Sequence, residues 1–335
     1  MINKNMKNGH NQYAPMPGVP LLRDRISAKL EKAYGIRYDP EKEITITAGA
    51  TQGIYTAIAS MVGDDDEVII FEPAYDSYAP AVQLSGGIVK YAVLEPPEFR
   101  INWQEVSRMV THRTRMIIIN SPHNPTGSIL RHEDLQELER LTRKSDITIL
   151  SDEVYEHLIY DGATHESVCR FPGLAERSFV TGSFGKTFHA TGWKMGYVLA
   201  PENLMNEFRK SHQFIVFTCN TPIQYAIAEF LGNRKNYTGL ETFYQAKRDA
   251  FADMISTSRF RLIPSHGTYF QLVDYSAISD ENDMDFAERL IREHGIGTIP
   301  VSPFYHGGDD HKLLRLCFAK KEETLEKAAN ILCKI

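Results

Sequence analysis

Short apolar runs alternate with helix-like stretches between residues 44 and 200, and this alternation constrains the fold more than any other feature of the chain. The runs have strand length and many β-branched residues: Ile44–Thr47, Val68–Phe71, Ile88–Val93, Arg115–Asn120, Ile147–Ser151, Ser178–Gly182 and Gly196–Ala200. Helical patterns lie between many of them, at Gln52–Val62, Tyr78–Leu84, Trp103–Val110 and His132–Lys144. This order predicts an α/β fold with a large, mostly parallel sheet covered by helices.

The pattern changes on either side of this region. An amphipathic helix is predicted at Leu21–Tyr34, and helices at Asn203–Gln213, Pro222–Leu231 and Leu240–Ile255 follow the last strand. An α+β tail then combines strands near Arg259–Ile263, Thr268–Val273 and Lys312–Phe318 with helices at Asp283–His294 and Glu322–Cys333. We therefore expect a large domain at residues 11–238, a small C-terminal domain at 239–335, and a remnant of an N-terminal segment at 1–10.

Composition excludes several functional classes. The 37 Lys and Arg against 43 Asp and Glu give a formal charge of −6, which argues against a nucleic-acid partner. No apolar run approaches the roughly 18 residues of a membrane span, and no signal-peptide pattern opens the chain. The four cysteines form no CxxC pair, and the histidines show no metal-ligand spacing. We expect a cytoplasmic protein with reduced thiols and no metal.

A turn of small residues follows the first predicted strand. Ala48–Gly53 then opens a helix, so its backbone N–H groups and the helix dipole would favour an anion. A plain turn with Thr51 as N-cap explains the same residues, and taken alone it is the simpler interpretation.

Polar residues also follow two later predicted strands. After Asn120, the run Ser121–Gly127 holds Asn124 between two prolines in a rigid loop. After Leu150, Asp152 stands at the end of an apolar strand, where a buried carboxylate needs a cation or hydrogen-bond donors. An ordinary turn and an ordinary N-cap are the alternatives at these two places.

Lys186 follows another apolar strand, among small and aromatic residues. The Gly-x-x-Gly-Lys-Thr run from Gly182 has two residues between its glycines, whereas a P-loop needs four, so we reject a nucleoside-triphosphate site. GxGxxG is absent too, which argues against a dinucleotide-dependent dehydrogenase. A lone lysine is usually a solvated surface residue. Its place directly after a buried strand makes Lys186 a candidate for chemistry.

Together these strand ends supply lysine, aspartate, asparagine and tyrosine side chains and an anion-binding turn. The chain resembles the fold-type I aminotransferases of class I/II, which depend on pyridoxal 5′-phosphate (PLP), and within them the methionine and kynurenine aminotransferase branch. The resemblance covers nearly the whole chain and rests on Asn11–Pro15, Gly49–Thr51, Glu72–Tyr78, Asn120–Gly127, Ser151–Tyr155, Ser183–Tyr197 and Arg315–Phe318. It implies the PLP-dependent transferase fold.

The resemblance assigns catalytic roles. Lys186 matches the lysine that forms a Schiff base with the cofactor and then moves the substrate proton. Asp152 matches the carboxylate that keeps the pyridine nitrogen protonated. Asn124 and Tyr155 match the pair that hydrogen-bonds the 3′ oxygen of the cofactor, and Tyr75 matches the aromatic residue that stacks on its ring.

The remaining roles concern anions. The cofactor phosphate is expected at the turn, with Ser183, Lys194 and, from the neighbouring subunit, Tyr13; the turn itself contributes Gly49, Ala50 and Thr51. A shared Tyr13 implies a homodimer. Arg315 matches the arginine that binds the substrate carboxylate, and Asn124 is expected to bind the substrate as well.

The implied function is an aminotransferase with a ping-pong mechanism. An amino acid (methionine, aromatic or glutamine-like) would donate its amino group, and a 2-oxo acid would accept it. Two alternatives stay open at this point: a PLP-dependent carbon–sulfur β-lyase, and an inactive PLP-fold binding or regulatory protein. The N-terminal arm and Gly-x-Pro segment of the family have no counterpart ahead of Asn11, so we expect an altered substrate pocket and dimer contact.

Overall fold

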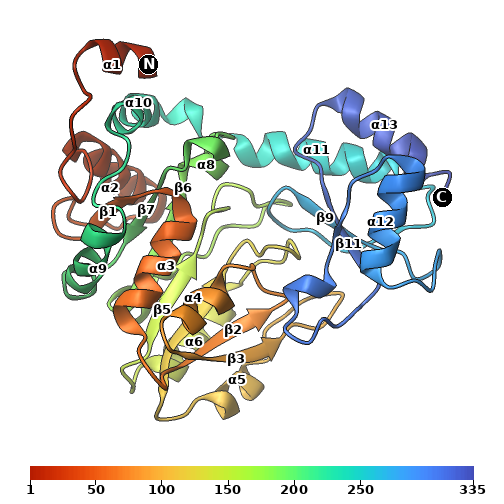
Figure 1. The fold of residues 1–335 in the computed structure, drawn as a ribbon, viewed down its shortest axis with the longest axis horizontal. Helices are drawn as coiled ribbons and strands as arrows, with labels where there is room; N and C mark the ends of the chain where they lie inside the picture. Colours follow the sequence, from red (N-terminus) through yellow and green to blue (C-terminus); the bar gives the residue numbers. More distant parts are fainter.

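A computed structural model describes all 335 residues, and its centre is a seven-stranded sheet (Figure 1). The strand order is β1-β7-β6-β5-β4-β2-β3, and every pairing is parallel except those of β7 with its two neighbours. The strands are β1 Ile44–Thr47, β2 Glu67–Glu72, β3 Ile88–Val93, β4 Thr114–Asn120, β5 Thr148–Asp152, β6 Ser178–Ser183 and β7 Gly196–Leu199. The predicted large, mostly parallel sheet is confirmed.

Helices cover both faces of this sheet. They are α2 Pro20–Tyr34, α3 Gly49–Met61, α4 Tyr78–Leu84, α5 Trp103–Met109, α6 His132–Thr142, α7 Pro172–Ala175, α8 Phe184–Thr187, α9 Glu202–Ile215 and α10 Thr221–Leu231. Side chains of β4 alternate between two cores because successive residues of a strand face opposite sides. Ile117 and Ile119 pack with α2 and α6, whereas Met116 and Ile118 pack with α3 and α9.

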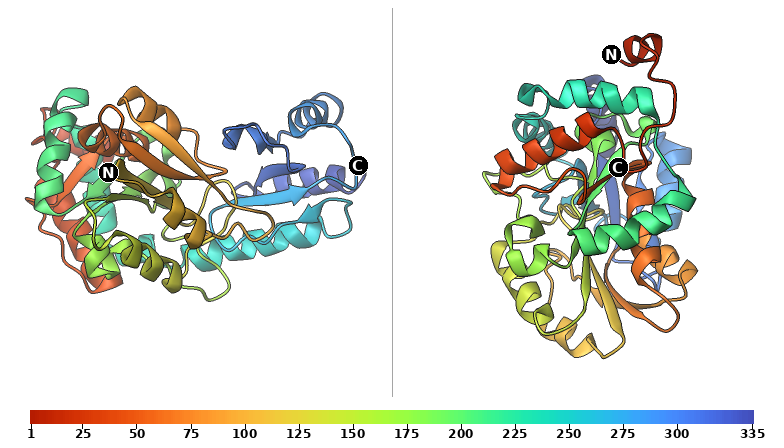
Figure 2. Two further views of the ribbon diagram at one scale, coloured as in Figure 1. Left: turned by 90° about the horizontal axis from the view of Figure 1, so that it is seen from below. Right: turned by 90° about the vertical axis from the view of Figure 1, so that its left-hand side faces the viewer.

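The remaining elements form a second, smaller unit around an antiparallel sheet of order β10-β11-β9-β8. The strands are β8 Arg261–Leu262, β9 Phe270–Asp274, β10 Ile299–Pro300 and β11 Leu313–Cys317; the helices are α11 Leu240–Met254, α12 Asp283–His294 and α13 Glu322–Leu332. These elements enclose a core of 22 buried residues, to which Val154, Tyr155, Leu158 and Tyr160 of the large unit also contribute. Figure 2 (left) shows the two units side by side, joined by α11. The boundary at residue 238 stays a prediction.

Several local expectations were wrong. The helix predicted from Gln52 begins at Gly49, because the small residues of the turn already adopt the first helical turn. The strand predicted at Arg259–Ile263 is only two residues long. Helix α1 (Ile2–Lys7) was not expected in so polar a segment; Asn5 and Lys4 bind Glu229 of α10 at 3.0 and 3.3 Å. No helix is both long and apolar enough to cross a membrane.

Four short 3₁₀ turns complete the chain, at η1 Val168–Arg170, η2 Thr191–Trp193, η3 Arg234–Asn236 and η4 Ser302–Phe304.

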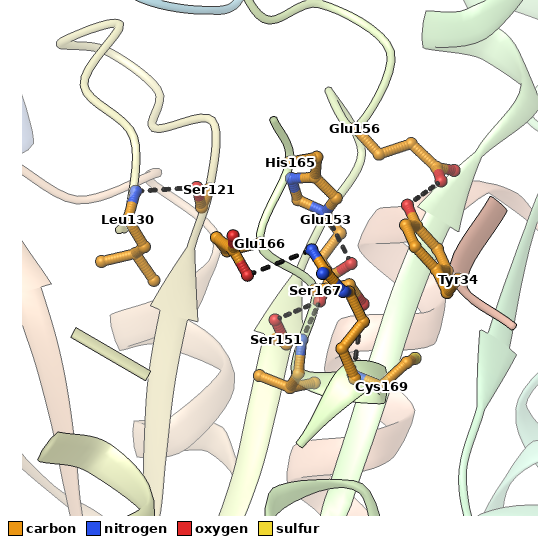
Figure 3. Close-up of polar contacts among 12 residues, drawn as sticks. Tyr34, Ser121, Leu130, Ser151, Glu153, Glu156, His165, Glu166, Ser167 and Cys169 are labelled. Carbon is orange, nitrogen blue, oxygen red and sulfur yellow. Dashed lines mark hydrogen bonds and ion pairs between the residues drawn. The ribbon is translucent and has the colours of Figure 1, made fainter. Parts of the chain in front are cut away.

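A buried ion pair connects α2 to the segment that follows β5. Lys29 pairs with Glu156, and both side chains are at most 6% exposed. The hydroxyls of Tyr34 and Tyr197 donate to the same carboxylate at 2.8 and 3.0 Å; Figure 3 shows the Tyr34 contact. Burial alone would raise the pKa of Glu156, but the Lys29 ammonium, with contributions from His157 and His165, outweighs burial and holds that pKa far below its usual range.

Replacing Lys29 by Met should therefore leave a buried carboxylate without its cation. We expect the free energy of unfolding, measured in urea, to fall by about 3 kcal/mol in Lys29→Met. The double variant Lys29→Met/Glu156→Gln should regain most of this loss, because no uncompensated charge remains. A single variant as stable as the double variant would contradict the account.

Candidate active site

The reversed direction of β7 brings polar residues from three strands to one edge of the sheet. Thr47 at the end of β1 and Ser183 at the end of β6 both pair with Gly196, the first residue of β7. Lys194, two residues before β7, therefore reaches the same edge as the residues that follow β1 and β6. This edge also carries the ends of β4 and β5, because their chains run parallel to β6.

The turn after β1 has the geometry of an anion-binding cradle. Gly49 has φ +78°, a left-handed conformation that favours glycine, and it opens the 13-residue helix α3. A Cβ on Gly196 would lie 2.9 Å from the Ala50 nitrogen, so only glycine allows the turn to approach β7 this closely. A Cβ on Gly49 would lie 3.5 Å from Lys194 Nζ, which makes no ion pair. The free cation and the helix start both favour an anion here.

Asp152 ends β5 as a buried carboxylate, 4% exposed. Tyr78 donates its hydroxyl to Oδ2 at 2.6 Å, and the Val154 backbone N–H donates to Oδ1 at 3.3 Å. Burial raises the pKa of Asp152 to about 6, although the Tyr78 hydrogen bond acts in the opposite direction. The bond from the Val154 N–H is the contact expected of a plain N-cap. The bond from the Tyr78 hydroxyl is an additional one that an N-cap does not require.

The loop after β4 is held by Asn120, whose amide donates to the Asp152 carbonyl at 2.9 Å and accepts from the Asn124 N–H at 2.8 Å. Asn124 in turn accepts from the guanidinium of Arg315 at 2.5 Å. Arg315 lies in β11 of the small sheet, so this contact joins the two units.

The Arg315 guanidinium has no carboxylate partner. Its guanidinium lies 4.1 and 5.2 Å from the ring centres of Phe270 and Phe304, and it forms no salt bridge. Desolvation lowers its pKa, and the Tyr155 hydroxyl opposes that effect. A desolvated, unpaired arginine is suited to binding a carboxylate ligand bidentately.

Lys186 sits in α8, where the Ser183 hydroxyl caps the helix by accepting from the Lys186 N–H at 3.3 Å. Its Nζ lies 3.1 Å from the Tyr269 hydroxyl and 5.5 Å from the ring centre of Tyr155. Desolvation raises the pKa of Tyr155 well above its usual value, and an interaction with the Tyr269 hydroxyl contributes. The amine therefore lies among phenol groups and forms no salt bridge.

One cavity is lined by several of these residues, whereas Gly49, Ser183, Lys194 and Arg315 are not among its lining residues. Its walls come from five places that the sequence predicted to meet: Ala50, Thr51, Ile54, Tyr75, Asn120, Asn124, Asp152, Val154, Tyr155 and Lys186. Tyr75 also contacts the Thr51 hydroxyl at 3.2 Å. A larger cavity of about 530 Å³ lies on the other side of the Asn120 loop, and it shares only Asn120 with this site. We place the candidate site at the smaller cavity, because it alone contains the lysine and the buried carboxylate.

Tyr13 is not part of this group in the single chain. It is 81% exposed, and its ring packs edge-on against Phe217 at 5.4 Å.

Sequence reasoning missed three residues that organise the site, namely Tyr78, Asn120 and Tyr269. Asn120 and Tyr78 belonged to recognised motifs, and a polar residue at a strand end was a signal for Asn120. Tyr269 gave no such signal, because it comes from the small unit, more than 80 residues after Lys186.

Comparisons with known proteins agree with this geometry. The family described as aminotransferase class I and II matches residues 2–332, and the chain belongs to that family. The chain is 48% identical to the methionine aminotransferase of Escherichia coli K12 over 322 residues, which is 96% of this chain and 83% of that protein. It is 34% identical to the kynurenine–oxoglutarate transaminase of Dictyostelium discoideum, over 98% of this chain and 84% of that protein.

The solved structures give the same result. YbdL of Escherichia coli, whose structure identified a methionine aminotransferase function, matches with a TM-score of 0.98 and 46% identity, covering 100% of this chain and 89% of that one. N-succinyldiaminopimelate aminotransferase of Mycobacterium tuberculosis matches with a TM-score of 0.95 and 34% identity, over 99% and 88%. The predicted resemblance and fold are confirmed, and the protein is an aminotransferase.

The raised pKa of Asp152 makes a prediction for the protein without cofactor. An unfolded aspartate titrates near pH 3.9, so between pH 4 and about 6 the folded chain keeps a proton that the unfolded chain has lost. This contribution to stability is complete below pH 4 and is lost as the pH rises through about 6. Relative to Asp152→Asn, wild type should lose about 2 kcal/mol of unfolding free energy between pH 4 and 7. Parallel pH profiles for the two proteins would show that the carboxyl titrates normally.

Proposed function

We propose that this aminotransferase uses PLP and transfers the amino group of methionine, or of an aromatic or glutamine-like amino acid, to a 2-oxo acid. One observation carries the proposal. A lysine that forms no salt bridge, a buried aspartate and an anion-binding turn beside a second lysine lie at a single edge of the sheet. The family as a whole depends on PLP.

The residues at this edge fit each part of the cofactor. The cradle at Gly49–Thr51, with Ser183 and Lys194, would hold the phosphate. Asp152 would pair with the ring nitrogen, and the positive charge there would offset the burial that raises its pKa. Asn124 and Tyr155 would bind the 3′ oxygen from the cavity wall, and Tyr75 would stack on the ring.

Lys186 would bind the cofactor covalently through Nζ. When bound, PLP withdraws electrons from the α-carbon of the amino acid, which makes the Cα–H bond acidic. The amine of Lys186, once free, would take the Cα proton on Nζ and return it to the other end of the conjugated system. Running the same steps in reverse with a second 2-oxo acid gives a ping-pong cycle.

The substrate carboxylate would bind Arg315. Its guanidinium has no anionic partner, and Asn124 orients it at 2.5 Å. Phe270 and Phe304 flank the guanidinium, so the surroundings are apolar. An apolar neighbourhood suits methionine or an aromatic side chain better than a second carboxylate. The similarity to methionine and kynurenine aminotransferases supports this substrate class.

We also propose a homodimer in which Tyr13 reaches the phosphate site of the partner subunit. Tyr13, Phe214 and Phe217 are 81%, 85% and 43% exposed, and Tyr13 packs on Phe217. Large exposed aromatic side chains gathered in one place are typical of protein interfaces.

A spectrophotometric screen of the twenty amino acids tests the activity. Bound PLP should change its absorption band on addition of methionine, and a 2-oxo acid should restore it. Lys186→Ala should fold and bind PLP but lose turnover by several orders of magnitude. Release of pyruvate and ammonia from a cysteine conjugate, without any 2-oxo acid, would instead identify a β-lyase. No spectral change with any amino acid would indicate a binding protein.

Hybrid dimers test the shared site. Lys186→Ala and Tyr13→Ala should each be weakly active at limiting PLP. In a mixed dimer, the Tyr13→Ala subunit still carries Lys186, and its Lys186→Ala partner still supplies Tyr13, so this one site is complete. An equal mixture that exchanges subunits freely should recover about a quarter of wild-type activity, because half of the dimers contain one complete site. A mixture no more active than the average of its parents would place Tyr13 outside the site.

A further inference from the structure

Tyr269 is the only side chain that hydrogen-bonds the Lys186 amine, at 3.1 Å from hydroxyl to Nζ. It immediately precedes β9 of the small sheet, and it is 8% exposed. Its ring meets that of Tyr155 edge-on at 5.3 Å, and Lys186 Nζ lies 5.7 Å from its centre. The amine of the large unit is therefore held by a residue of the small unit.

The four residues before Tyr269, here called the docking segment (265–268), attach to two loops of the large unit. The N–H groups of His266 and Gly267 both donate to the Gly127 carbonyl at 2.9 Å. The Thr268 N–H donates to the Leu158 carbonyl at 3.0 Å, and the Tyr160 N–H donates to the His266 carbonyl at 3.0 Å. Backbone hydrogen bonds thus place the docking segment independently of its side chains.

The docking segment is also conformationally strained. A Cβ on Gly267 would lie 2.6 Å from the Pro122 Cβ and 2.8 Å from the Leu158 carbonyl oxygen, so only glycine fits. Thr268 is fully buried with φ +67°, a conformation that β-branched residues rarely adopt. Its hydroxyl accepts from the Phe270 N–H at 3.1 Å, and its carbonyl accepts from the Tyr160 hydroxyl. Such strain persists only where the surroundings fix it, and here it sets the direction of Tyr269.

We propose that Tyr269 is a positioning residue for Lys186: its hydroxyl holds the lysine amine at the cavity whenever the amine is not bonded to the cofactor. This role rests on the proposed function of Lys186 as the group that moves the Cα proton. A free lysine has four rotatable bonds, and without a partner it would sample many positions away from the substrate. Tyr269 keeps its own proton and supplies no atom to the product.

Tyr269→Phe tests the proposal, because it removes the hydroxyl and keeps the ring. With methionine as donor, we expect the single-turnover rate of the first half-reaction to fall about tenfold. The effect of α-deuteration on that rate should increase, since proton transfer would become slower relative to other steps, while KM and PLP affinity should stay within about twofold. Tyr244→Phe is the matched control. Tyr244 is also buried, its ring centre lies 6.2 Å from that of Tyr269, and it makes no contact with Lys186. It should behave as wild type.

A second measurement uses the protein without cofactor. Trace acetylation of Lys186 by acetic anhydride, quantified by peptide mass spectrometry against the exposed Lys321, reports how freely the amine reacts. In Tyr269→Phe, acetylation should be about fivefold faster than in wild type, because the amine has lost its hydrogen-bond partner. Unchanged acetylation and an unchanged first half-reaction would overturn the role of Tyr269. If wild type reacts with no amino acid, the proposed function fails, and acetylation alone decides whether Tyr269 holds the amine.

Discussion

The end of β5 is the constraint on which the rest of the structure depends. Asp152, Val154 and Tyr155 line the candidate site, whereas Glu153 and Glu156 line a second, small cavity. Figure 3 shows this second region, where Glu153 meets His165 at 2.8 Å and Ser151 at 2.9 Å. The carboxylates of Glu153 and Glu156 are both buried and hydrogen-bonded, so these contacts hold the segment in place. The side chains that line the candidate site are left free to bind a ligand.

Close backbone approach completes the same edge. A Cβ on Gly182 would lie 2.2 Å from the Tyr197 ring, and one on Gly196 would meet the carbonyl of Gly182 at 2.8 Å. Glycines at both positions let β6 and β7 bring Ser183 and Lys194 toward the cradle at Gly49. The chain has a net charge of −6, but its backbone brings the cationic groups of the site close together. The composition alone does not reveal this local concentration of positive charge.

Local patterns predicted much of the molecule. Strand β3 and helix α4 begin and end at the predicted residues. The polar residues at strand ends predicted the position of the cavity and most of the residues that line it. The reversal of β7 was not predictable, because strand direction depends on pairing and not on the strand's own residues. Tyr269 was missed for a related reason: its position depends on backbone contacts with Gly127 and Leu158, which no local pattern encodes. Roles carried by resemblance, including those of Tyr13 and Arg315, remain predictions.

The central claim is that one edge of the sheet holds a phosphate, a pyridine nitrogen and an aldehyde carbon in register with Lys194, Asp152 and Lys186. A crystal structure of the protein grown with PLP tests this most directly. We predict continuous density from Lys186 Nζ to the cofactor, with the ring nitrogen within hydrogen-bonding distance of Asp152 and the phosphate at the Gly49–Thr51 turn. Cofactor density in the larger cavity behind Asn120, or a ring nitrogen directed away from Asp152, would contradict the account.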